Sequence, residues 1–160
     1  MTHKRKTNFF CLFLCLFVLM LDQATKLSIT SFINAGTFIN ICPHFNVVLT
    51  FNAGTSFGLL APNNLSEYYL IIILSILCIV FLFYIFIKSY NSTEKIMYAI
   101  LIGGATSNLV DRFLHGAVVD FIDIYYKTWH WPAFNFADMF ICCSAISLVG
   151  YNLFASQSSK

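Results

Sequence analysis

Two aspartates, Asp120 and Asp138, lie beside hydrophobic segments in a chain that contains few charges. Moving a carboxylate into hydrocarbon costs ~2.5–3.5 kcal/mol or more, so an acid at the edge of a membrane segment is a candidate functional group. If the two carboxyl groups face one another, both cannot ionise cheaply, and the pair holds one shared proton. Such a pair can hydrolyse an amide, because the ionised member takes a proton from the attacking water and the protonated member protonates the leaving amine. The alternative is structural: Asp120 would be a surface acid at a strand end and Asp138 the N-cap of a helix.

Other polar residues near these acids predict a supporting shell. Gly104, Asn108 and Asp111 are spaced i, i+4 and i+7, which places an amide and a carboxylate on one face of a helix. Gly103 and Gly104 fit close helix packing as well as a functional role. Arg112 follows Asp111, and a neighbouring guanidinium can orient a carboxylate and keep it ionised, so we expect both to support the site rather than react.

The remaining titratable residues give weaker signals. Asp22 and Lys26 are four residues apart, which is typical of a solvated helix pair worth ~0.3–0.5 kcal/mol; the alternative for Asp22 is a recognition role at a membrane boundary. The cysteines and histidines form no C-x-x-C pair and no metal-ligand spacing, so we expect no metal, no cofactor and no dithiol redox chemistry.

The composition places these residues in a membrane protein. Of 160 residues, 59% are hydrophobic and 10% are charged, with a mean hydropathy of +0.77, whereas soluble domains are roughly 25% charged. The net charge of +2 is small and its basic residues are scattered, so nucleic acid is not an expected partner.

We predict an all-α membrane protein of one domain, 1–160, with four transmembrane helices at about 8–27, 68–88, 95–111 and 138–155. The first apolar run, behind a basic N-terminus, also fits a cleavable signal peptide, but no A-x-A-like site follows it, and we favour a retained helix. Four spans with outer loops at 28–67 and 112–137 place both termini on the same side of the membrane as Lys88 and Lys95. Because basic residues favour the cytoplasmic side, we expect both termini in the cytoplasm, and most of the acids then lie on the outer face. In the first outer loop, Phe45, Val47, Leu49 and Phe51 alternate with polar residues, interrupted at Val48, which predicts a short strand or hairpin.

Five sequence blocks, read in order, carry a family resemblance. They are Asp22-Gln23-Ala24-Thr25-Lys26, Phe51-Asn52-Ala53-Gly54-Thr55-Ser56-Phe57-Gly58, Gly103-Gly104-Ala105-Thr106-Ser107-Asn108-Leu109-Val110-Asp111-Arg112, Gly116-Ala117-Val118-Val119-Asp120-Phe121 and Phe134-Asn135-Phe136-Ala137-Asp138. Together they resemble the lipoprotein signal peptidases, the type II signal peptidases of bacteria, over nearly the whole chain. Ser56 and Ser107 depart from the family pattern, which commonly has alanine and glycine there.

The resemblance implies an aspartic endopeptidase of the bacterial inner membrane that cuts prolipoprotein signal peptides before a diacylglyceryl-modified cysteine. Its partners would be those precursors and membrane lipids, and it would act as a monomer. The family's fold would add a small extracytoplasmic β-cradle, matching the segment before Asn52, and a lid between helices 3 and 4, matching Ile124 to Trp131. By motif, Asp120 and Asp138 would be catalytic, and the pocket would include Asp22, Asn52, Asn108, Asp111, Arg112 and Asn135.

Two other functional classes fit parts of the sequence. A small polytopic transporter or channel subunit with an acidic outer vestibule would also carry intramembrane Asp and Asn, but it predicts polar groups at mid-membrane. A structural assembly protein would use Gly103 and Gly104 for helix contacts and would leave the clustered acids unexplained.

Overall fold

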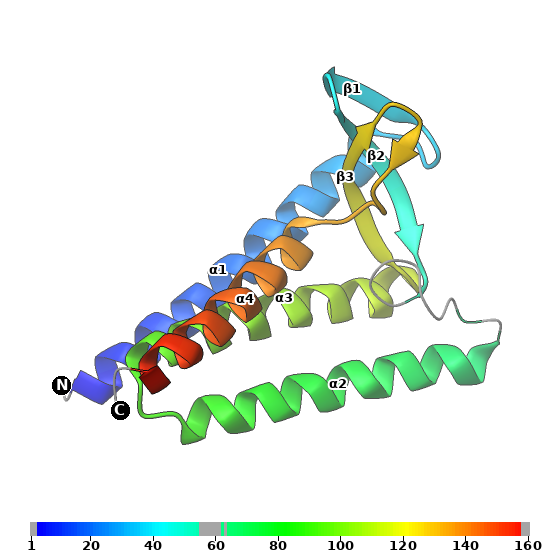
Figure 1. Cartoon of the computed structure of the whole chain (residues 1–160). Coiled ribbons are helices and arrows are strands. Elements are labelled where there is room, and N and C mark those ends of the chain that lie inside the picture. The colour runs from blue at the N-terminus through cyan, green and yellow to red at the C-terminus, as the bar shows by residue number, and fades with distance from the viewer. Residues whose placement is uncertain (1–2, 55–61, 63, 158–160) are drawn as a thin grey trace.

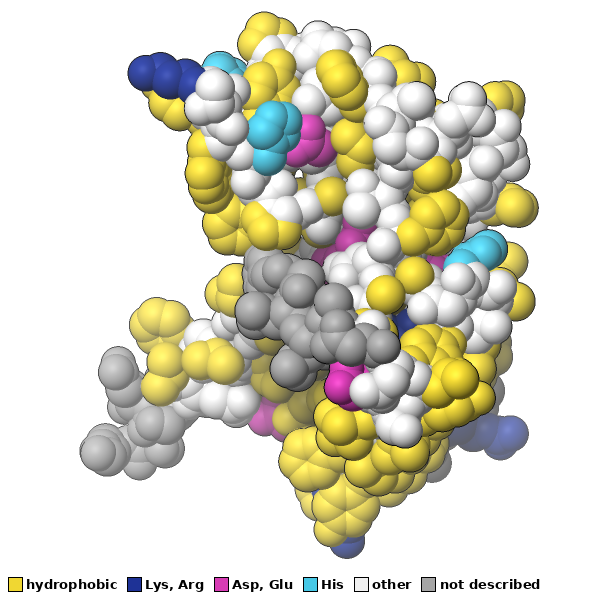
Figure 2. All heavy atoms as spheres, turned by 90° about the vertical axis from the view of Figure 1, so that its right-hand side faces the viewer, with side chains coloured by type: hydrophobic (Ala, Val, Ile, Leu, Met, Phe, Trp, Pro, Cys, Tyr) yellow, Lys and Arg dark blue, Asp and Glu magenta, His cyan; other side chains and the backbone are white. Residues whose placement is uncertain are grey.

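The computed structural model describes residues 3–54, 62 and 64–157. Within these ranges the chain forms four long helices and a small antiparallel sheet at one end of them (Figure 1). The helices are α1 (His3–Phe32), α2 (Leu65–Lys88), α3 (Ser92–His115) and α4 (Phe136–Gln157). On the face seen in Figure 2, hydrophobic side chains cover much of the helical part.

Three of the helices in the described part are long and apolar enough to cross a membrane: Arg5–Phe32, Leu65–Lys88 and Phe136–Phe154. The predicted span over 95–111 lies in α3 and is not among them. The reason is one of composition, because α3 carries more polar residues than such a span allows; α3 packs against all three other helices, and its Lys95, Ser107, Asn108 and Asp111 are buried in the protein. Whether α3 also crosses the bilayer stays a prediction.

Close helix packing around α3 depends on two adjacent glycines. A Cβ at Gly103 would lie 2.6 Å from the carbonyl oxygen of Cys15 in α1, and a Cβ at Gly104 would lie 2.9 Å from the carbonyl oxygen of Ala137 in α4. Such distances are shorter than real Cβ contacts, so only glycine permits these approaches. The two glycines therefore allow α1 and α4 to pack closely against α3.

The sheet is larger than the sequence predicted. It consists of strands in the order β1-β2-β3-β4: β1 (Phe38–Cys42), β2 (Phe45–Asn52), β3 (Val118–Tyr126) and β4 (Trp129–His130). The predicted strand before Asn52 is confirmed, and its register shift between Val47 and Thr50 falls at the expected interruption. The expected loop 112–137 instead contains β3 and β4, so the protein is mostly helical and the small sheet expected beside the helices draws its strands from both predicted loops. Ile33, Leu49 and Val119 form the apolar core that fixes this sheet to the end of α1.

The segment that the resemblance assigned to a lid, Ile124 to Trp131, forms most of the β3–β4 hairpin. In it, Tyr125 pairs with His130, and the His130 ring nitrogen lies 2.8 Å from a carboxylate oxygen of Asp123. Lid motion stays a prediction. Thr55 to Gly58, including the family departure at Ser56, lies outside the described residues.

Candidate active site

Asp120 and Asp138 come from different elements and are joined by Asn135. Asp120 lies in β3 opposite Thr50, and Asp138 lies in the first turn of α4. The Asn135 side-chain amide donates to Asp120 Oδ1 at 2.7 Å, while the Asn135 backbone N–H donates to Asp138 Oδ2 at 3.4 Å. The backbone N–H of Asp138 donates in return to Asn135 Oδ1 at 2.9 Å. This reciprocal pair is a capping box, so Asn135, and not Asp138 as the structural alternative supposed, is the N-cap of α4.

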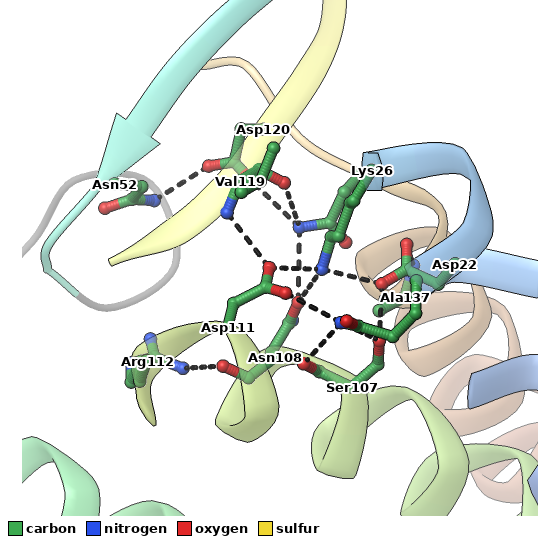
Figure 3. Close-up of polar contacts among 12 residues, drawn as sticks. Asp22, Lys26, Asn52, Ser107, Asn108, Asp111, Arg112, Val119, Asp120 and Ala137 are labelled. Carbon is green, nitrogen blue, oxygen red and sulfur yellow. Dashed lines mark hydrogen bonds and ion pairs between the residues drawn. The ribbon is translucent and has the colours of Figure 1, made fainter. Parts of the chain in front are cut away.

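Two further asparagines hold the aspartates from opposite sides. Asn108 in α3 donates its side-chain amide to Asp138 Oδ1 at 2.8 Å, and its own Oδ1 accepts from Asn135 at 3.2 Å. Asn52, at the end of β2, donates to Asp120 Oδ2 at 3.1 Å (Figure 3). A continuous set of hydrogen bonds therefore runs from Asn52 through both candidate acids to α3.

The environment of Asp120 favours its protonated form. Its side chain is 2% exposed, and burial, together with the nearby Asp138 carboxylate, raises the pKa of Asp120 to about 7. The hydrogen bonds from Asn52 and Asn135 and the positive charge of Lys26 oppose this rise. A carboxyl group that titrates near pH 7 can hold a proton and release it during a reaction.

Arg112 supports the site in a different way from the one predicted. Its guanidinium donates to the carbonyl oxygens of Gly54 at 3.0 Å and Asn108 at 3.3 Å. The ion pair of Asp111 is formed with Lys26, at 2.7 Å, so the expected orientation of Asp111 by its neighbour Arg112 is wrong. Helical geometry explains this, because consecutive residues on a helix point in different directions.

Asp22, Lys26 and Asp111 form a buried ion triplet (Figure 3). Lys26 Nζ lies 2.6 Å from Asp22 Oδ2 and 2.7 Å from Asp111 Oδ2, and all three residues are at most 3% exposed. The prediction of a solvated Asp22–Lys26 pair is therefore wrong. Packing of α3 against α1 supplies the second carboxylate and removes the water.

An open cavity of about 640 Å³ borders the site. Apolar and small side chains of α2, α3 and α4 form most of its wall, together with the segment from Trp131 to Phe134. Its polar lining includes Asn52, Asn108, Arg112 and Asp138. The cavity thus has a largely apolar wall that also exposes one candidate acid, Asp138, and the amide side chains of Asn52 and Asn108.

Comparisons with known proteins agree with this geometry. The family model described as signal peptidase (SPase) II matches residues 14–154. The chain belongs to the signal peptidase II family. It is 34% identical to the lipoprotein signal peptidase of Serratia marcescens, over 86% of this chain and 81% of that protein. With the lipoprotein signal peptidase of Actinobacillus succinogenes it shares 36% identity, over 98% of this chain and 94% of the relative.

Solved structures of a bacterial membrane enzyme share the fold of this signal peptidase II family member. One, at 2.3 Å resolution, superposes with a TM-score of 0.82 and 31% identity, covering 94% of this chain and 90% of that one. A second, at 1.9 Å, gives a TM-score of 0.77 with 32% identity, covering 89% and 91%. Membership in a peptidase family favours proteolysis over the transporter and assembly-protein alternatives.

The structure brings all eight predicted site residues into one hydrogen-bonded region, although their roles stay predictions. Sequence reasoning missed Lys26, Gln23 and Ser107 as parts of it. Gln23 Nε2 donates to Asp111 Oδ1 at 2.7 Å and to Ser107 Oγ at 3.0 Å, and Ser107 Oγ donates to Asp22 Oδ2 at 2.7 Å. The available signal was their membership in the same family-like blocks as Asp22 and Asp111.

Proposed function

We propose that Asp120 and Asp138 are the catalytic pair with which this signal peptidase II family member cleaves the signal peptides of lipoprotein precursors. The observation that carries the proposal is the Asn135 bridge, which contacts both carboxyl groups, together with the presence of Asp138 in the cavity lining. An aspartic mechanism of peptide hydrolysis is further supported by the pKa of about 7 at Asp120, because the pair then holds one proton near neutral pH.

In the proposed reaction, Asp138 is the ionised member and Asp120 holds the proton. Asp138 removes a proton from a water molecule as the water oxygen bonds to the scissile carbonyl carbon, while Asp120 donates a hydrogen bond to the carbonyl oxygen. The tetrahedral intermediate then collapses, the C–N bond breaks and Asp120 gives its proton to the leaving amine, while Asp138 keeps the proton from water, so that the pair again holds one proton. Asn108 and Asn52 keep the two carboxyl groups oriented through their hydrogen bonds.

The cavity wall supports a lipid-modified precursor as substrate. A diacylglyceryl-modified cysteine and the apolar signal segment before it would lie against the apolar side chains of α2 and α4. Arg112 and Asn52 line the same cavity and would contact the polar backbone beside the scissile bond.

The cellular placement follows from the proposed reaction and from the charge pattern. We infer an inner-membrane protein, crossing four times as a monomer, with lipids as neighbours, both termini in the cytoplasm and the site on the outer face. The first turns of α1 and the last turns of α4 lie at the end of the bundle away from the sheet, which supports a common side for the termini (Figure 1). The β3–β4 hairpin, next to the cavity segment at Trp131, would act as the lid.

Purified enzyme in lipid vesicles tests this function with a matched pair of precursors. One precursor carries the diacylglyceryl-modified cysteine, and the other carries the same cysteine unmodified. We expect mass spectrometry to find a single cut immediately before the modified cysteine and negligible cleavage of the unmodified precursor. Equal cleavage of both, or a cut elsewhere, would refute the proposed substrate.

A further inference from the structure

The carboxylates of the buried ion triplet accept hydrogen bonds from two backbone N–H groups (Figure 3). Asp22 Oδ1 accepts the backbone N–H of Ala137 at 2.9 Å, and Asp111 Oδ2 accepts the backbone N–H of Val119 at 3.0 Å. Ala137 directly precedes Asp138, and Val119 directly precedes Asp120. Each buried carboxylate thus fixes the backbone one residue before one of the proposed catalytic aspartates.

Lys26 connects these two anchors. Its ammonium group has three N–H donors, and the structure gives it three acceptors: Asp22 Oδ2 at 2.6 Å, Asp111 Oδ2 at 2.7 Å and Asn108 Oδ1 at 2.9 Å. The third acceptor belongs to the asparagine that donates to Asp138. One ammonium group therefore holds both backbone anchors and a side chain of the site at fixed distances.

Two neutral side chains complete the triplet. Two carboxylates and one ammonium carry a net charge of −1, and a buried charge needs hydrogen-bond donors. Ser107 supplies one donor to Asp22, and Gln23 supplies one to Asp111 while also donating to Ser107. With these bonds each carboxylate accepts from three groups: Lys26, one side chain and one backbone N–H.

We infer that the Asp22–Lys26–Asp111 triplet, completed by Gln23 and Ser107, is a positioning device that sets the separation between the carboxyl groups of Asp120 and Asp138. The inference rests on the proposed function. The cavity lining found among the described residues includes neither Gln23 nor Lys26, so the device acts on the reaction through the backbone and Asn108 rather than by touching substrate. Lys26 also acts through its charge, which lowers the pKa of Asp120.

Gln23→Leu is the principal test, because it leaves every charge in place and removes the bonds to Asp111 and Ser107. We expect kcat for a lipid-modified precursor to fall about tenfold or more, the rate equivalent of one hydrogen bond to a charged group, with KM unchanged. Thr25→Val is the matched control, since its hydroxyl bonds only within α1, to the carbonyl of Leu21, and faces outward. A folded Gln23→Leu enzyme with wild-type kcat, even at a lower melting temperature, would overturn the inference, because a merely structural role predicts that result.

Lys26→Met adds a second readout. Displacement of catalytic groups by about 1 Å costs on the order of 100-fold in rate, so we expect at least this loss of kcat. We also expect the decline of activity at high pH to move to higher pH, because the pKa of Asp120 rises when the Lys26 charge is removed. An unmoved decline in a folded variant would count against the inference; if Lys26→Met does not fold, Gln23→Leu decides alone. Should the Asp120→Asn and Asp138→Asn enzymes both retain turnover, the catalytic pair itself fails, which is a separate outcome.

Discussion

Replacing the proposed catalytic acid Asp120 by asparagine should stop the reaction and also make the protein more stable at neutral and alkaline pH. In the folded protein burial raises the pKa of Asp120 to about 7, against an ordinary value of 3.8. The folded state therefore holds the Asp120 proton more tightly than the unfolded state does. The contribution to stability is complete below pH 3.8, declines as pH rises from about 4 to about 7, and is then lost.

The size of the effect follows from the same values. A difference of about 3 pH units corresponds to about 4 kcal/mol at about 1.4 kcal/mol per unit, and wild type loses this amount between pH 4 and pH 8. Asparagine does not ionise and avoids the loss. It offers one acceptor oxygen where Asp120 accepts from both Asn52 and Asn135, so one hydrogen bond worth about 1 kcal/mol is removed. We expect Asp120→Asn to be more stable than wild type by about 3 kcal/mol at pH 8 and not more stable at pH 4.

Thermal unfolding of both proteins in the same detergent, from pH 4 to pH 8, measures this difference. Asp123→Asn is the matched control in the same strand. Asp123 accepts from Asn46 at 2.8 Å and contacts the His130 ring at 2.8 Å, so its replacement should lower the melting temperature. A melting temperature of Asp120→Asn below wild type at pH 8, or a difference that does not grow with pH, would refute the reasoning.

Three further substitutions test other parts of the site. Asn52→Ala removes a hydrogen bond that lowers the pKa of Asp120, so the high-pH decline of cleavage should move upward and the maximal rate should fall; an unchanged pH profile would contradict this. Arg112→Ala removes the guanidinium that donates to the carbonyl oxygens of Gly54 and Asn108 and should reduce both purified yield and cleavage rate, as measured per milligram of membrane protein. Gly103→Ala forces a Cβ against the Cys15 carbonyl and should destabilise the protein by about 1–3 kcal/mol in thermal unfolding, whereas Gly150→Ala, with open space around the Cβ, should not.

Local sequence rules predicted part of what local geometry determines. The spacing of Asn135 and Asp138 is that of a capping box, but the sequence analysis considered Asp138 rather than Asn135 as the N-cap. The i, i+4 spacing placed Asn108 correctly on the inner face of α3. The family resemblance then named all eight residues that the structure brings together.

The buried ion triplet around Lys26 could not be predicted from local sequence spacing. A pair at i, i+4 looks the same in sequence whether the helix face is wet or buried, and only the packing of α3 against α1 decides between them. The third member of the triplet, Asp111, is 85 residues away from Lys26 in the sequence. Its immediate neighbour Arg112 was the obvious partner on sequence grounds, but it points elsewhere in the helix.

Strand β3 was missed for a different reason. Val118–Tyr126 is rich in β-branched and aromatic residues, which is a strand signal, but six of its nine residues are buried and include two acids. Burial of both faces removes the alternation by which a half-buried strand is recognised. Pairing with β2, which lies far away in the sequence, supplies the backbone hydrogen bonds.

The catalytic role of the two aspartates is tested most directly by single-turnover cleavage of a diacylglyceryl-modified precursor in vesicles, with equal amounts of folded Asp120→Asn, Asp138→Asn and Asp123→Asn enzyme. We predict no detectable product from the first two variants and readily measurable product from Asp123→Asn, whose carboxyl group belongs to the hairpin. Product formation by Asp120→Asn or Asp138→Asn at a rate close to that of wild type would contradict this prediction.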